Sequence, residues 1–111
     1  MQRVEQVGDA IVIYVKDHLD LASAASLNSS IELAKGNERQ RIVVSLEGCG
    51  FCDSAGLSVL VRAHKRHGSR FFVVLSDEAP CRRSFSVTGL ATLIQLVPTV
   101  QRALDVGLGA A

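Results

Sequence analysis

Ser54 is the residue of this chain best placed for chemistry, because its position predicts a hydroxyl at the start of a helix. The apolar run at residues 42–46 predicts a strand before it. After it, residues recur at the i, i+3, i+4, i+7 spacing of one helical face: Leu57, Leu60, Val61 and His64. Either Asp53 or Ser54 can accept a hydrogen bond from a free amide of the first helical turn. Because a helix begins with a positive dipole end, a phosphoryl group on this hydroxyl would be tolerated.

The residues that follow Ser54 leave room for a second molecule to approach. Ala55 and Gly56 add almost no side-chain bulk. Two interpretations of Ser54 compete: it is either a phosphate acceptor or only a helix cap, since serine is among the commonest caps. Asp53, in turn, either positions the hydroxyl for a kinase or serves only as a turn residue.

The sequence Phe-Cys-Asp-Ser-Ala-Gly-Leu-Ser-Val-Leu at residues 51–60 resembles the signature of the STAS domain family. That family includes the bacterial anti-sigma-factor antagonists, which usually carry Asp-Ser-Ser-Gly-Leu or Asp-Ser-Thr-Gly-Leu there. In the antagonists the first serine of the motif is phosphorylated, and it corresponds to Ser54. This chain has Ala55 where the family often has a second hydroxyl, so Ser54 is the only phosphate acceptor within the five-residue motif at 53–57.

The resemblance also implies a partner-binding face. Asp20 follows a neighbouring expected strand, so parallel topology brings it to the same end of the sheet as Asp53. By the resemblance, this loop and the following helix form the face, and Ser58, Val59 and Arg62 are its expected outward positions. For Ser58 and Arg62 the alternative is a solvated helix face. The implied partner-binding residues are Asp20, Asp53, Ser54, Ala55, Gly56, Ser58, Val59 and Arg62.

In function, the chain resembles a non-enzymatic regulator of sigma-factor-dependent transcription. The resemblance implies an unmodified form that binds an anti-sigma factor, itself a serine kinase, and so frees a sigma factor. That kinase would use ATP and Mg²⁺ to phosphorylate Ser54, and a PP2C-like phosphatase would reverse the step, so no cofactor belongs to this chain. The alternative is a STAS domain that serves as a scaffold or transport-complex subunit, in which Ser54 only caps a helix.

Serine hydrolysis is disfavoured as a role for Ser54. The hydrolase motif Gly-x-Ser-x-Gly is broken, since Cys52 stands at its first glycine, and the hydrolase sheet needs far more than 111 residues. His64 and His67 lie downstream on the same helix and should point away, which leaves only His18 as a nearby histidine. The sequence also lacks a Walker-type loop, so it should not hydrolyse ATP itself.

Cys49 and Cys52 have the Cys-x-x-Cys spacing of a redox pair or of half a metal site. Redox pairs of this type normally open a helix, however, and this one ends an expected strand. In the STAS alignment both cysteines replace aliphatic core residues, and Cys81 is distant in sequence. We therefore expect core packing, with no metal, and keep redox control as a minor hypothesis.

Composition predicts one compact domain over residues 1–111, with a frayed tail at about 108–111. The chain is 48% hydrophobic and carries a net charge of +1, which favours neither nucleic acid nor an anionic membrane as a partner. Aromatic residues make up only 5%, too few for a base-stacking surface. No apolar run approaches the ~20 residues that cross a bilayer, and the first residues lack a secretory signal, so we expect a cytoplasmic protein.

Alternating strands and helices predict an α/β fold with parallel units. Strands are expected at 4–7, 10–15, 41–46, 70–75 and 93–97. Helices are expected at 21–35, at 55–67, from Pro80 to Gly89, and from Pro98 onward. The buried positions expected in the first helix are Leu21, Ala24, Ala25, Leu27, Ile31 and Ala34. Those expected in the last helix are Val100, Ala103, Leu104 and Leu108. The resemblance implies the STAS fold, a small mixed, mostly parallel sheet of 4–5 strands with about four helices mainly on one face. Strand 10–15, apolar on both faces, instead predicts cover on both sides.

Overall fold

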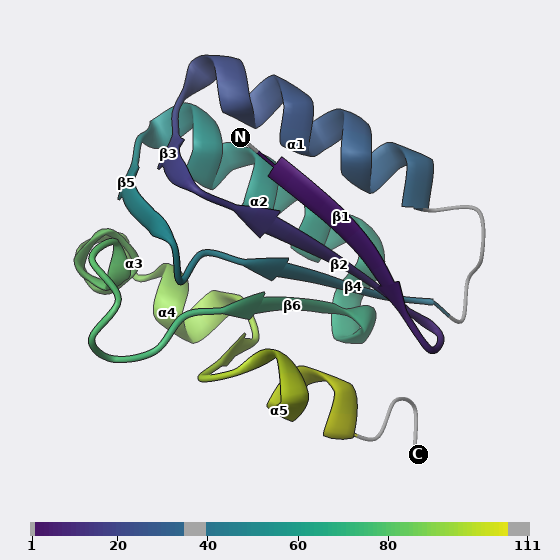
Figure 1. Cartoon of the computed structure of the whole chain (residues 1–111). Helices are drawn as coiled ribbons and strands as arrows, with labels where there is room; N and C mark the ends of the chain where they lie inside the picture. The colour runs from purple at the N-terminus through teal and green to yellow at the C-terminus, as the bar shows by residue number, and fades with distance from the viewer. Residues whose placement is uncertain (1, 35–39, 107–111) are drawn as a thin grey trace.

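A mixed five-stranded sheet forms the centre of the structure, a computed structural model that describes residues 2–34 and 40–106 (Figure 1). Its strands lie in the order β1-β2-β4-β6-β7, and only β1 runs antiparallel to its neighbour. The strands are β1 (Gln2–Val7), β2 (Ala10–Val15), β4 (Arg41–Ser45), β6 (Phe71–Val74) and β7 (Leu96–Val97). This confirms the α/β class and the mostly parallel sheet.

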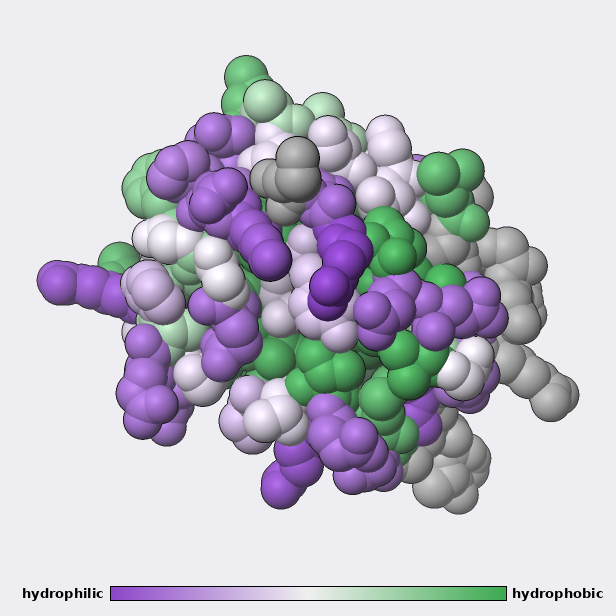
Figure 2. Space-filling model, viewed as in Figure 1, coloured by the Kyte–Doolittle hydropathy of each residue, from purple (hydrophilic) through white to green (hydrophobic). Residues whose placement is uncertain are grey.

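Helices cover both faces of this sheet, unequally (Figure 1). The larger core lies under α1 (Leu21–Ala34) and α2 (Ser54–His67) and also takes in residues of α3 and α4. The smaller core lies under α5 (Val100–Asp105), where Ala103 packs with residues of the central strands. The apolar pattern of strand 10–15 is thereby explained, since Val12 joins the smaller core and Ile13 the larger one. In Figure 2, apolar side chains gather near the middle of the face in view, between polar ones.

A second, two-stranded sheet leads into the turn at Ser54. It pairs β3 (Asp17–Leu19) with β5 (Cys49–Cys52) in parallel. The expectation that the strand at 41–46 runs directly into the turn was therefore wrong. Asp17, at the start of β3, has a φ of 67°. Aspartate tolerates this left-handed region better than most residues.

The helix at 21–34 buries a narrower face than expected. Ala24, Leu27 and Ile31 are buried, as predicted. Leu21, 76% exposed, and Ala25 instead face outward, because the helix contacts the sheet along a single stripe. The side chain of Ala34 and the predicted helix end at 35–37 lie outside the described residues.

The C-terminal third contains one helix that the sequence did not predict. Helix α3 (Arg82–Thr88) begins two residues after Pro80 and ends at Gly89, and α4 (Leu90–Leu93) follows at once. Because α4 takes up Leu93, the last strand shrinks to β7. A short 3-10 turn, η1 (Gly68–Arg70), joins α2 to β6. Within the described residues, no helix combines the length and the apolar character that a bilayer span requires. The expected inner position Leu108 and the tail at 108–111 lie outside those residues.

Candidate functional site

Asp53, and not Ser54, caps helix α2. Its Oδ1 accepts a hydrogen bond of 3.0 Å from the Gly56 amide, and its extended backbone sits outside the helix. Ser54 is the first helical residue, one position earlier than the expected start at Ala55. The interpretation of Ser54 as the side-chain cap therefore loses its basis.

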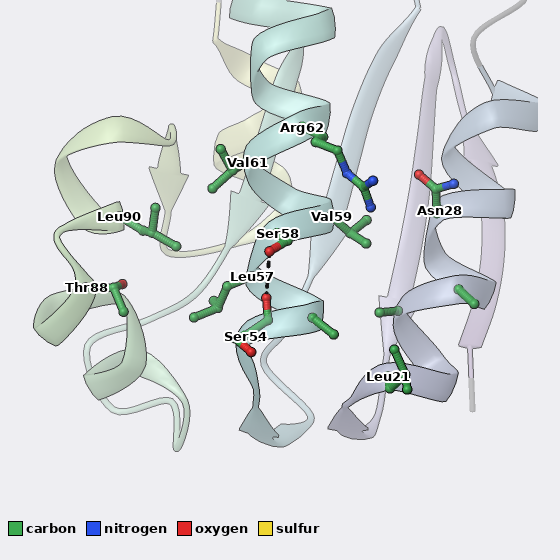
Figure 3. A pocket seen from close by; sticks show the side chains of 13 residues that line it. Leu21, Asn28, Ser54, Leu57, Ser58, Val59, Val61, Arg62, Thr88 and Leu90 are labelled. Atoms are coloured by element: carbon green, nitrogen blue, oxygen red, sulfur yellow. Dashed lines mark hydrogen bonds between the residues drawn. The ribbon is translucent and has the colours of Figure 1, made fainter.

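The Ser54 hydroxyl is exposed and makes no hydrogen bond within the described part of the chain. Ser58, one turn later, is also exposed, but its hydroxyl donates to the Ser54 carbonyl oxygen at 2.8 Å (Figure 3). The Ser54 and Ala55 amides have no acceptor inside the helix, because they belong to its first turn. A negative group on Ser54 would therefore meet free N–H donors and the positive end of α2.

Gly56 lets α2 begin in direct contact with β3. A Cβ at this position would lie 2.5 Å from Leu19 Cγ and 2.6 Å from the Leu19 carbonyl oxygen. That carbonyl already accepts a 3.0 Å hydrogen bond from the Asp53 amide. The strand end and the helix start are thus locked together, and this contact positions Ser54.

Asp20 lies beside this junction, at the end of the strand that pairs with β5, as parallel topology predicted. Its Oδ1 accepts from the Ser23 amide at 3.1 Å, and its own amide donates to Ser23 Oγ at 2.9 Å. Asp20 thereby caps the start of α1. The hydrogen bonds that the Asp20 carboxylate accepts from the Ser23 amide and the Ser23 hydroxyl lower the pKa of Asp20.

A mainly apolar groove of about 780 Å³ lies against Ser54. It runs along α1 and α2 and reaches α3 and α4 (Figure 3). Arg62, exposed two turns above Ser54, extends toward Asn28 of α1 across this groove. Its lining includes Leu21, Ala25, Asn28, Leu57, Val61 and Leu90.

Val59 is the one predicted outward position that the structure contradicts. It is 4% exposed and belongs to the larger core, although its edge touches the groove floor. The buried face of α2 is rotated about the helix axis relative to the predicted face. Leu60 is buried as predicted, whereas Leu57 and Val61 are only half-buried. The helix turns this way because Gly56 must face β3, which brings Val59 inward.

None of the histidines is arranged as a base for Ser54. His67 is buried in the last turn of α2, at the far end from Ser54. His18, the nearby candidate, packs its ring edge-on against Phe51, with the ring centroids 6.4 Å apart.

The three cysteines lie together beneath the site. Cys49, Cys52 and Cys81 are all at most 5% exposed, and their sulfurs lie within 4.8 Å of one another. The predicted core packing of the Cys-x-x-Cys pair is confirmed. The sequence did not predict that Cys81 would lie beside this pair, because no local pattern connects residues 52 and 81. Hydrogen bonds from the other two thiols lower the pKa of Cys49. The pKa values of Cys52 and Cys81 are raised, chiefly by their hydrogen bonds with Cys49.

Replacing Asp53 with alanine should lower the free energy of unfolding by about 0.5–2 kcal/mol, because the Gly56 amide loses its acceptor. Urea denaturation followed by circular dichroism measures the change. Asp53→Asn is the matched control, since its amide oxygen can still accept this bond. An equal loss in both variants would show that the charge, and not the hydrogen bond, stabilises the helix start.

The sequence and the fold both match known proteins. The sequence model of the STAS domain matches residues 1–103. The fold resembles an anti-sigma factor antagonist from Mycobacterium paratuberculosis, at 29% identity over 94% of this chain and 90% of that one, with a TM-score of 0.79. It also resembles a STAS domain antagonist from Planctomyces limnophilus, at 22% identity over 93% and 94%, with a TM-score of 0.78.

A third similar structure is the Bacillus cell fate determinant SpoIIAA in its phosphorylated form. It is 21% identical, over 95% of this chain and 97% of that one, with a TM-score of 0.67, a likeness that concerns the fold. The family match extends over nearly all described elements and includes the turn at Ser54. The chain belongs to the STAS domain family.

Proposed function

We propose that this chain is an anti-sigma-factor antagonist whose binding to its partner is switched off by a phosphate on Ser54. One observation carries the proposal: the Ser54 hydroxyl is exposed and unbonded at a helix start that Asp53 already caps, on the edge of an apolar groove. The similarity to anti-sigma-factor antagonists supports the same role. The activity is binding, and the chain performs no chemistry of its own.

The groove along α1 and α2 is the proposed docking surface for an anti-sigma factor. Its apolar lining supplies area for burial, while Asp20, Ser58 and Arg62 supply polar contacts around it. Ala55 keeps the approach to the helix start open, and Val59 contributes to the floor of the groove. Gly56, which was expected in the partner face, is instead buried against Leu19 and does not line the groove.

A phosphate on Ser54 would oppose docking without unfolding the domain. It adds a charge of roughly −1.5 to −2 at the end of α2 that favours negative charge. A partner that buries this position would have to desolvate the phosphate or lose close contact. Since about 1.4 kcal/mol corresponds to tenfold in affinity, even one such defect is sufficient for a switch.

The phosphate would come from the partner, an anti-sigma factor with serine kinase activity that uses ATP and Mg²⁺. The Ser54 oxygen would attack the γ-phosphorus, release ADP and give up its proton. In this proposal the kinase supplies the base that takes this proton. A PP2C-like phosphatase would hydrolyse the ester, and the chain itself would need no cofactor. All of these proteins are expected in the cytoplasm.

Incubation with a serine-kinase anti-sigma factor, ATP and Mg²⁺, followed by peptide mass spectrometry, tests this proposal. Phosphate should appear on Ser54 alone, and Ser54→Ala should abolish it. Ser58→Ala is the matched control and should be modified normally, because the Ser58 hydroxyl is already engaged with a carbonyl oxygen. Phosphate on another residue, or labelling that survives Ser54→Ala, would refute the switch and favour a scaffold role.

A further inference from the structure

The cluster of Cys49, Cys52 and Cys81 has a composition and a location that core packing alone does not require. The sulfur atoms come from two separate segments, β5 and the residue before α3. They converge in the larger core, and two of them, Cys52 and Cys81, also line a groove of about 500 Å³ that lies between β5 and α3. The cluster is therefore buried but has a path to solvent.

The spacing of the sulfurs matches that of a thiolate metal site. Zinc–sulfur bonds of about 2.3 Å place the sulfurs of a tetrahedral site about 3.8 Å apart. The sulfurs of Cys49 and Cys52 lie 3.8 Å apart, and all three lie within 4.8 Å of one another. Closing the remaining distances requires shifts of no more than about 1 Å.

The charge balance favours a divalent soft ion. Three thiolates leave one net negative charge around Zn²⁺ and two around a monovalent ion such as Cu⁺, and burial penalises the larger charge more. Cys52 directly precedes the cap of α2, so the positive end of that helix lies beside the cluster. Arg83, which lines the same groove, adds a cation nearby.

We propose that Cys49, Cys52 and Cys81 bind a zinc ion through three thiolates, with a water on the groove side as the fourth ligand. Binding would form three Zn–S bonds, and each cysteine that is still protonated would break its S–H bond and release that proton to solvent. The hydrogen bonds of Cys49 to the Phe51 carbonyl and of Cys81 to the Leu46 carbonyl would be lost. Two thiols at Cys-x-x-Cys spacing are only half a metal site, and the fold adds the third, Cys81.

A bound ion would connect the start of α3 to the strand that enters the Ser54 turn. Cys52 lies two residues before Ser54, and Cys81 is the last residue before α3. Zinc would therefore stabilise the wall of the site in the folded state, and unfolding would release it. This inference is independent of the phosphate switch.

Zinc titration of the reduced, untagged chain against a chromophoric chelator tests the site. We expect one ion per chain and a rise in melting temperature with zinc. Loss of a residue that only hydrogen-bonds to a metal ligand typically weakens metal affinity by roughly 10–100-fold. Cys81→Ala removes a ligand itself, so zinc affinity should fall by at least that factor. Ser84→Ala, at another position on the same groove, is the control and should bind normally.

Cobalt substitution provides a readout on the unmodified chain, in case an alanine variant fails to fold. The thiolate-to-cobalt charge-transfer band should have the intensity of three Co–S bonds. Binding below one equivalent, a band for two thiolates, or affinity unchanged in Cys81→Ala would overturn the proposal. So would formation of a Cys49–Cys52 disulfide in a chain that takes up no zinc.

Discussion

The Gly56→Ala variant should lose about 1–3 kcal/mol of unfolding free energy, although it adds only one methyl group. The new Cβ would lie 2.5 Å from Leu19 Cγ and 2.6 Å from the Leu19 carbonyl oxygen. A side chain could yield, but this carbonyl is held by the Asp53 amide, so the start of α2 must move away from β3. Urea denaturation measures the loss.

Gly50→Ala is the matched control for this prediction. Gly50 lies in β5, and its added Cβ would meet only the Asp17 carbonyl oxygen, at an ordinary 3.5 Å. Its effect should be a small fraction of that at Gly56. If both variants unfold at the same urea concentration as the unmodified chain, the contact between β3 and α2 does not position Ser54 as described.

Local signals in the sequence were sufficient to predict the helix starts beside the site. Asp20 and Asp53 each precede a helical pattern, and both cap a helix as side-chain chemistry predicts. What remained open was which of two adjacent residues would cap α2. Asp53 takes this role, which leaves the Ser54 hydroxyl without a capping hydrogen bond to make.

The features that the sequence did not predict depend on contacts between distant segments. Strand β3 has only three residues, too few to show a period, and it exists because β5 lies beside it. Val59 faces inward because the close approach at Gly56 fixes the rotation of α2. Cys81 joins Cys49 and Cys52 only through the packing of α3 on the larger core.

The Ser54→Asp variant should bind the anti-sigma factor at least tenfold more weakly than the unmodified chain, while Ser54→Ala should bind within about threefold of it. Aspartate adds charge at the groove edge and is itself favoured at a helix start, so folding should be unaffected. Titration calorimetry measures affinity, and thermal unfolding establishes that both variants fold.

A negative charge placed on another exposed residue tests whether the loss of affinity depends on the position of the charge or only on the net charge of the protein. Ser29 is exposed on α1 and does not line the groove, so Ser29→Asp should retain full affinity. Equal weakening by Ser29→Asp and Ser54→Asp would mean that net charge, and not occupancy of the helix start, governs binding. Equal binding by Ser54→Asp and Ser54→Ala would instead identify a scaffold whose docking ignores this hydroxyl. A loss confined to Ser54→Asp requires a partner surface that covers the first turn of α2, which is where the free amides and the groove meet.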